Sequence, residues 1–114
     1  MREKIRDKER IEHMLEAIDN LFEFTHGLSY EQYKENKMLK FAVIKNIEII
    51  GEAAYMTTKS LQENHPEIEW ANVIGMRHVL VHGYYNIDDH ISWVVIQNDL
   101  EPLKEKLEAI LKTL

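Results

Sequence analysis

Apolar residues recur along the chain at the spacing of amphipathic helices. From residue 11 to residue 22 they follow the i, i+3, i+4, i+7 pattern of one helix face, at Ile11, Met14, Leu15, Ile18, Leu21 and Phe22. The charged residues before Ile11 extend this helix by a solvated turn or two, and Gly27 marks its end. Ser29 and Gln32 then have the spacing of a capping box, which predicts a short helix after the turn.

The most apolar stretch runs from residue 37 to residue 61, "KMLKFAVIKNIEIIGEAAYMTTKSL". Its apolar stripe is wide, with Leu39, Ala42, Val43, Ile47, Ile50, Ala54 and Leu61 on or near one face. A helix with such a face lies in the middle of a bundle or at an interface. Gly51 costs a helix interior about 1 kcal/mol relative to alanine, which favours a close approach of another helix there.

The second half of the chain also follows a helical pattern. "ENHPEIEW" (63–70) predicts a turn, with Pro66 at or near the first position of the next helix. That helix carries Trp70, Val73, Ile74, Val79, Leu80 and Val81 and continues up to Gly83. Asp88 or Asp89 caps a last helical region from about residue 89 to 113.

Two further features complete the fold prediction. Pro102 should kink or split the last helical region, with Asp99 as a possible new cap. No run of alternating apolar and polar residues between turn residues indicates a sheet. We therefore expect residues 1–114 to form one all-α domain, an up-and-down bundle of four main helices plus a short helix, which dimerises.

Composition narrows the class of protein. With 45% hydrophobic residues in 114 the chain buries a real but small core, which oligomerisation would supplement. The absence of cysteine excludes disulfides, thiolate metal sites and a cysteine nucleophile. The charged N-terminus lacks the apolar core of a secretory leader, and no apolar run approaches the roughly 18 residues of a membrane span. We expect a cytoplasmic protein with no membrane contact.

The net charge of −6 restricts any role on nucleic acid. Domains that hold nucleic acid by charge alone carry a basic surface. Nucleic-acid chemistry here would need a local positive site or a partner that positions the substrate.

The segment "MRHVLVHGYYNID" (76–88) holds such a site. His82 can take and give a proton near neutral pH, and Arg77 offers a fork of donors suited to phosphate oxygens. On an ideal helix the two would diverge by about 140°, but Gly83 should end the helix and free its last turn. Together with Tyr84 they could share a rim. One histidine cannot be base and acid in the same step, so two copies across a two-fold axis make more chemical sense.

Ordinary structural roles also account for these residues. A histidine near a helix C-terminus more often caps carbonyls than catalyses. Arg77 could be a surface arginine, and Tyr84 and Tyr85 could pack against the bundle. Composition and spacing alone leave both interpretations open.

Arg77, His82 and Tyr84 match the R-x4-H-x-Y motif, and at these residues the chain resembles the HepT-like toxins of the HEPN superfamily. The segments "IIGEAAYMTT" (49–58), "IEWANVIGMRHVLVHGYYNID" (68–88) and "DLEPLKEKLEAIL" (99–111) are also similar to that family. The likeness covers essentially the whole chain. It implies a dimeric helical bundle with a metal-independent ribonuclease site in a shared cleft, and tRNA or mRNA as the target.

The resemblance also implies a partner and residue roles. The partner is a minimal nucleotidyltransferase antitoxin, which transfers AMP from ATP to the motif tyrosine, in a homodimer or a larger hetero-oligomer. Arg77 and His82 become the catalytic pair and Tyr84 the AMP acceptor, with no metal or cofactor. His78 stands where the family often has asparagine, so it could be a second proton carrier, and the split of acid and base between His78 and His82 stays open.

Other residues, and other functions for the whole chain, also have to be considered. Glu52 could orient an arginine or histidine of the cleft, or lie on the polar edge of its helix without a catalytic task. The remaining histidines show no local metal pattern and are interpreted as surface or capping residues: His13, His26, His65 and His90. A different class of function is a non-catalytic module that binds a nucleotide or a nucleotidyltransferase. A third is a helical dimerisation domain whose motif only caps a helix.

Overall fold

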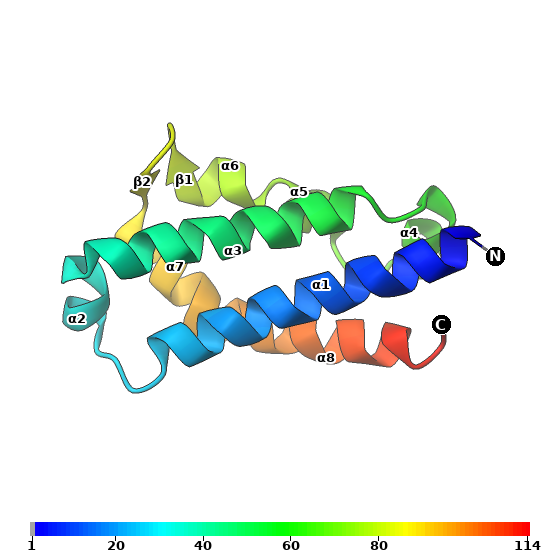
Figure 1. The fold of residues 1–114 in the computed structure, drawn as a ribbon, viewed down its shortest axis with the longest axis horizontal. Coiled ribbons are helices and arrows are strands. Elements are labelled where there is room, and N and C mark those ends of the chain that lie inside the picture. The colour runs from blue at the N-terminus through cyan, green and yellow to red at the C-terminus, as the bar shows by residue number, and fades with distance from the viewer. Residues whose placement is uncertain (1) are drawn as a thin grey trace.

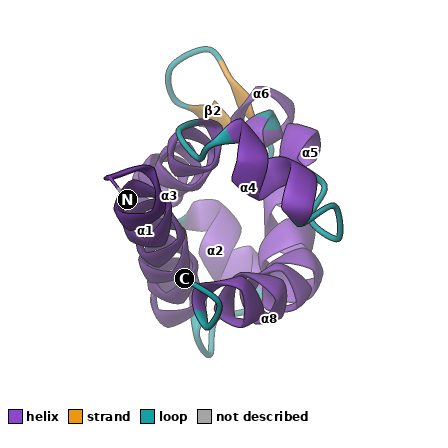
Figure 2. Ribbon diagram, turned by 90° about the vertical axis from the view of Figure 1, so that its right-hand side faces the viewer, coloured by secondary structure: helices purple, strands orange, loops and turns teal. Residues whose placement is uncertain are grey.

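The computed structural model describes residues 2–114, with side chains described from residue 6 onward. Two long antiparallel helices, α1 (Arg2–Thr25) and α3 (Lys37–Tyr55), lie side by side, and α8 (Leu100–Leu111) packs against α1 (Figure 1). Viewed along the long axis, α1, α3, α5 (Trp70–Ile74) and α8 surround a common core (Figure 2). The predicted helical class is confirmed. None of the helices in residues 2–114 is both long enough and apolar enough to cross a membrane.

The N-terminal part of the prediction is confirmed residue by residue. Ile11, Met14, Ile18 and Leu21 have no exposed surface, because they form the face of α1 that packs on α3 and α8. The helix ends at Thr25, and Gly27 makes the turn with a φ of +75°. The capping box is present before α2 (Tyr30–Glu35), where Ser29 and Gln32 satisfy each other's backbone N–H groups.

The central helix is shorter than predicted. It ends at Tyr55, and the short helix α4 (Lys59–Asn64) follows with Thr58 as its N-cap. The Asp7 carboxylate accepts hydrogen bonds from the backbone N–H of Thr58 at 2.8 Å and from its hydroxyl at 2.6 Å. These bonds attach the turn between α3 and α4 to α1. Leu61 is buried as expected, but it belongs to α4 rather than to the central helix.

The helix predicted to begin near Pro66 and to continue up to Gly83 is instead two short helices. Gly75 separates α5 from α6 (Met76–Leu80), and the helix ends three residues before Gly83. The position predicted for Pro66 is also wrong, because Pro66 lies in a turn before α5. The Trp70 indole N–H donates to the His65 carbonyl at 3.0 Å and folds that turn back on itself.

Gly51 has the role that its position predicts. A Cβ on Gly51 would lie 3.1 Å from the carbonyl oxygen of Ile74, which is a backbone atom and cannot swing aside. The absence of a side chain therefore lets α5 lie directly against α3.

The prediction that the chain has no sheet is wrong by one small hairpin. Strands β1 (Val81–His82) and β2 (Asn86–Ile87) pair antiparallel, with Val81 opposite Ile87 and His82 opposite Asn86. Gly83 opens the connecting loop with a φ of +73°, a conformation that glycine adopts without strain. Each strand has only two residues, too few for an alternating pattern to show in the sequence.

The last helical region begins where expected but is not split. Asp88 caps α7 (Asp89–Val94), and its carboxylate accepts from the backbone N–H of Ile91 at 2.9 Å. The helix then passes through a five-residue π-helical segment, η1 (Val95–Asp99), into α8. Asp99 makes no side-chain cap. Pro102 has no N–H to donate to the preceding turn. The helix accommodates the missing bond after a wider π-helical turn and continues without a break.

Candidate active site at the hairpin

The Arg77 guanidinium is held between two elements. Its Nε donates to the Glu48 carboxylate of α3 at 3.0 Å, and its Nη2 donates to the Gly83 carbonyl at 3.1 Å. The side chain is 38% exposed, so the group is fixed in direction yet open to solvent. Arginine has five N–H donors, and the donors that these two bonds leave can face a phosphate.

His82 directly precedes the Gly83 carbonyl that Arg77 binds, but its backbone conformation differs from the one predicted. It lies on β1 opposite Asn86, exposed, and is not in a frayed last helical turn. Gly83 is the next residue after His82. The Arg77 guanidinium therefore binds the backbone of the residue adjacent to His82. The backbone N–H of Asp88 donates to the Leu80 carbonyl at 2.8 Å and closes the base of the hairpin.

The other predicted site residues differ in position. Tyr84 is 91% exposed at the tip of the hairpin, and its neighbour Tyr85 is 61% exposed. In Figure 1 this loop projects beyond the helices, above α3. His78 is exposed on α6, one residue after Arg77 and therefore about 100° around the helix from it. The alternative that Tyr84 and Tyr85 pack against the bundle is wrong.

Glu48 is the site residue that the sequence did not single out. Glu52, one turn further along α3, is exposed and makes no ion pair among residues 6–114. Both acids lie four residues apart on one face of α3, so the sequence could not show which of them meets Arg77. The meeting depends on where Gly51 lets α5 approach α3, and hence on where α6 follows.

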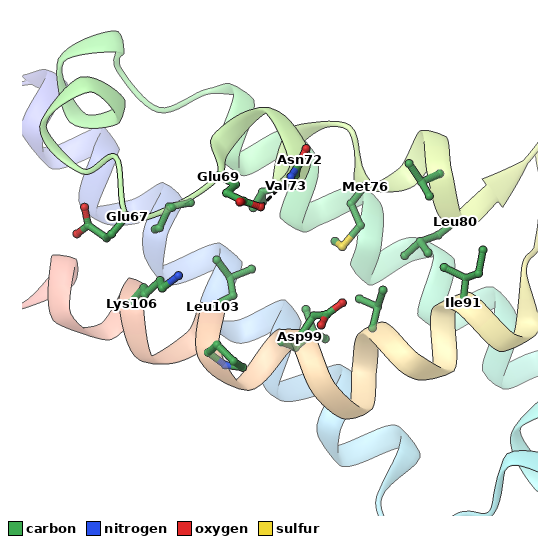
Figure 3. A pocket seen from close by; sticks show the side chains of 15 residues that line it. Glu67, Glu69, Asn72, Val73, Met76, Leu80, Ile91, Asp99, Leu103 and Lys106 are labelled. Carbon is green, nitrogen blue, oxygen red and sulfur yellow. Dashed lines mark hydrogen bonds between the residues drawn. The ribbon is translucent and has the colours of Figure 1, made fainter.

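A groove of about 460 Å³ lies beside the motif but does not contain it. Apolar side chains of α5 and α6 line one wall and those of α7, η1 and α8 the other, with charged groups at the edge that include Glu67, Asp99 and Lys106 (Figure 3). Met76, Val79 and Leu80 of α6 face this groove, whereas Arg77 bonds to α3. The groove and the charged site therefore occupy different faces of α6.

In the described part of the chain, the side chains that could bind a metal ion are those of histidine, aspartate and glutamate. In this part of the chain, no three histidine, aspartate or glutamate side chains gather closely enough to hold one. Without a metal ion, the chemistry that these residues can offer is proton transfer by His82 of the hairpin and charge stabilisation by Arg77 of α6.

Comparison with known proteins identifies the family. The model of the family described as "Ribonuclease HepT-like" matches residues 14–110, a range that contains the whole hairpin and its motif. The chain belongs to the HepT-like ribonuclease family. Within the matched range, Arg77 lies on α6, His82 on β1 and Tyr84 in the loop of the hairpin.

Relatives in this family carry ribonuclease names. "Probable ribonuclease HepT" of Thermococcus cleftensis is 36% identical over 105 residues, covering 92% of this chain and 96% of the relative. "Putative RNase MJ1380" of Methanocaldococcus jannaschii is 33% identical over 97 residues, covering 85% of this chain and 89% of the relative. No solved structure matches the chain.

Proposed function

We propose that this HepT-like protein is a metal-independent endoribonuclease whose catalytic residues are Arg77 and His82. The observation that carries the proposal is the Arg77 guanidinium, held by Glu48 of α3 and by the Gly83 carbonyl at the start of the hairpin loop, directly after the exposed His82. The ribonuclease names of the relatives support the same reaction. A net charge of −6 is compatible with it, because the cationic group is local.

The reaction is an internal transesterification. His82 takes the proton of a ribose 2′-hydroxyl, and the 2′-oxygen attacks the adjacent phosphorus while Arg77 stabilises the charge that develops on the phosphate oxygens. The bond from phosphorus to the 5′-oxygen breaks, and that oxygen takes up a proton. The products are a 2′,3′-cyclic phosphate and a free 5′-hydroxyl.

The proton for the leaving 5′-oxygen requires a second acid. We propose that a homodimer supplies it, with His82 of a second protomer facing the first, and His78 as the alternative within one chain. Exposed apolar side chains on α6 and α7 support an association beside the motif. Val79 is 58% exposed and Ile91 41% exposed, and both line the groove of Figure 3.

The protein acts as the toxin of a toxin–antitoxin pair in this proposal, with tRNA or mRNA as its cytoplasmic target. The antitoxin is a minimal nucleotidyltransferase, bound to the homodimer in a larger hetero-oligomer. The Tyr84 hydroxyl attacks the α-phosphorus of ATP, pyrophosphate leaves, and the AMP that remains blocks Arg77 by charge and bulk. The 91% exposure of Tyr84 supports this role, since a second enzyme must reach the hydroxyl.

The test is cleavage of total RNA by purified protein in EDTA. We expect the wild-type protein to produce fragments with 2′,3′-cyclic phosphate ends, identified by mass spectrometry, and His82→Ala and Arg77→Ala to produce none. Both variants should keep the helical circular dichroism spectrum of the wild type, because the two side chains lie at the surface. When expressed in cells, neither variant should inhibit growth. Cleavage that requires Mg²⁺, or equal cleavage by all three proteins, would overturn the proposal.

A further inference from the structure

The hairpin exposes two aromatic rings beside the proposed site. Tyr84 and Tyr85, which we call the tyrosine tip, are 91% and 61% exposed. Burying a ring of this size is favourable, so two adjacent rings left in water on a small domain indicate a surface that binds something. The proposed modification uses the Tyr84 hydroxyl but leaves Tyr85 without a task.

The tyrosine tip is held firmly although it is exposed. The loop begins at Gly83 in a left-handed conformation and continues directly into β2. The pair of His82 with Asn86 closes it from below, and the Arg77 guanidinium bonds to the Gly83 carbonyl at 3.1 Å. Because the backbone of the loop is pre-organised, less conformational entropy is lost when a ligand covers the rings.

The bond from Arg77 also fixes what lies next to the tip. The guanidinium donates to the carbonyl of the residue just before Tyr84, so a phosphate on its remaining donors would lie beside the tyrosine rings. In single-stranded RNA the unpaired bases can be splayed out and can stack on aromatic side chains. A charge of −6 gives this chain no general attraction for RNA, whereas stacking does not depend on charge.

We propose that Tyr85 stacks on an unpaired base next to the phosphate that Arg77 binds. The substrate class is then single-stranded RNA, such as a loop or an unpaired end, and double-stranded RNA is excluded because its bases are already stacked. The stacking site rests on the proposed ribonuclease function and adds a substrate-positioning residue to it. Tyr85 contributes through its ring and not through its hydroxyl.

The test measures binding of a short, unstructured RNA oligonucleotide by fluorescence anisotropy in a His82→Ala background, which prevents cleavage. Tyr85→Ala should weaken binding about 5- to 150-fold, the range that loss of one base–aromatic stack produces. Tyr85→Phe keeps the ring and should keep the affinity within about twofold of the parent. The matched control is Tyr55→Ala, since Tyr55 is also an exposed tyrosine, 69% exposed, but lies at the far end of α3.

A second readout separates stacking from a structural effect. In the active protein Tyr85→Ala should raise KM with little change in kcat, because the stack is equally present in ground and transition states. In the His82→Ala background, removing single bases near the cut should locate one abasic position at which the parent and its Tyr85→Ala derivative bind equally. A change in the secondary structure or in the molecular mass of Tyr85→Ala would instead count against a role in RNA binding.

The outcomes distinguish this inference from the proposed function. If the wild-type protein cleaves RNA and Tyr85→Ala binds it as tightly as the parent, stacking is wrong and the nuclease stands. If Tyr85→Phe loses as much affinity as Tyr85→Ala, the hydroxyl acts and not the ring, which also overturns the inference. If His82→Ala and wild type both leave RNA intact, the proposed function fails whatever the tip binds.

Discussion

Removing the Glu48 carboxylate should reduce catalysis more than stability. Glu48→Ala takes away the acceptor of the 3.0 Å bond from the Arg77 Nε and leaves only the Gly83 carbonyl to hold the guanidinium. Glu48 and Arg77 are 35% and 38% exposed, and an ion pair between such groups contributes about 0.5 to 1 kcal/mol to folding. We therefore expect the melting temperature to fall by only about 2 to 5 °C.

The expected loss of activity is larger than this. A misplacement of about 1 Å in a catalytic group can cost about 100-fold in rate. In Glu48→Ala the Arg77 guanidinium would be positioned by one hydrogen bond, to the Gly83 carbonyl, instead of two. We expect kcat/KM for RNA cleavage to fall about 10- to 100-fold, equivalent to about 1.4 to 2.7 kcal/mol of transition-state stabilisation. Glu48→Gln retains a neutral acceptor of the same shape and should lie between wild type and Glu48→Ala.

The assay is steady-state cleavage of a fluorogenic RNA oligonucleotide, with Glu52→Ala as the matched control. Glu52 is an exposed glutamate one turn along the same helix, and its loss should leave kcat/KM within about twofold of the wild type. Because Glu48 is proposed to act through Arg77, adding Glu48→Ala to Arg77→Ala should cost no further activity. Full activity in Glu48→Ala, an equal loss in Glu52→Ala, or a further loss in the double variant would each refute the reasoning.

Three further predictions concern the modification, the assembly and the core. After incubation with the nucleotidyltransferase and ATP, mass spectrometry should find AMP on Tyr84, and Tyr84→Phe should escape silencing; AMP on Tyr85 would contradict the assignment. The wild-type protein should have a dimeric mass by light scattering at micromolar concentration, and Val79→Asp should be monomeric yet folded; a monomeric wild type would rule out the dimer. Burial raises the pKa of Tyr33 from its ordinary value near 10 to about 12, so the stability that its neutral phenol contributes is complete below pH 10 and declines as the pH rises toward 12. Chemical denaturation at stepped pH should show this decline, and Tyr33→Phe should remove it; an unchanged alkaline profile would contradict it.

Local patterns were sufficient to predict much of the fold. The apolar stripe of α1, the capping box at Ser29 and the cap at Asp88 depend on residues within a turn or two of one another. Such interactions have the same period wherever the helix lies, so the sequence shows them directly. The resemblance to the HepT-like family likewise depends on residue identity and spacing, and the family match confirms it.

The breaks within helices were harder to predict, because distant parts of the chain stabilise them. After the end of α3, Thr58 bonds to Asp7, which lies 51 residues earlier in the chain. The turn at Pro66 depends on the Trp70 indole, and the passage through Pro102 depends on a π-helical turn. None of these breaks and turns changes the periodicity of the apolar residues. The sequence therefore shows a continuous helical pattern where the structure has a break or a π-helical turn.

The site shows the same division most clearly. The sequence indicated which residues carry the proposed chemistry only through the resemblance to the HepT-like family, because an arginine and a histidine at this spacing also have ordinary structural roles. Only the tertiary structure decided how they meet: α6 ends at Leu80, a two-residue ladder turns the chain back, and Glu48 and the Gly83 carbonyl fix Arg77. Arg77 meets Glu48 and not Glu52 in the packed structure, in which α5 lies against Gly51 and α6 follows α5. A contact between α3 and α6 is a property of the packed core, and no single segment encodes it.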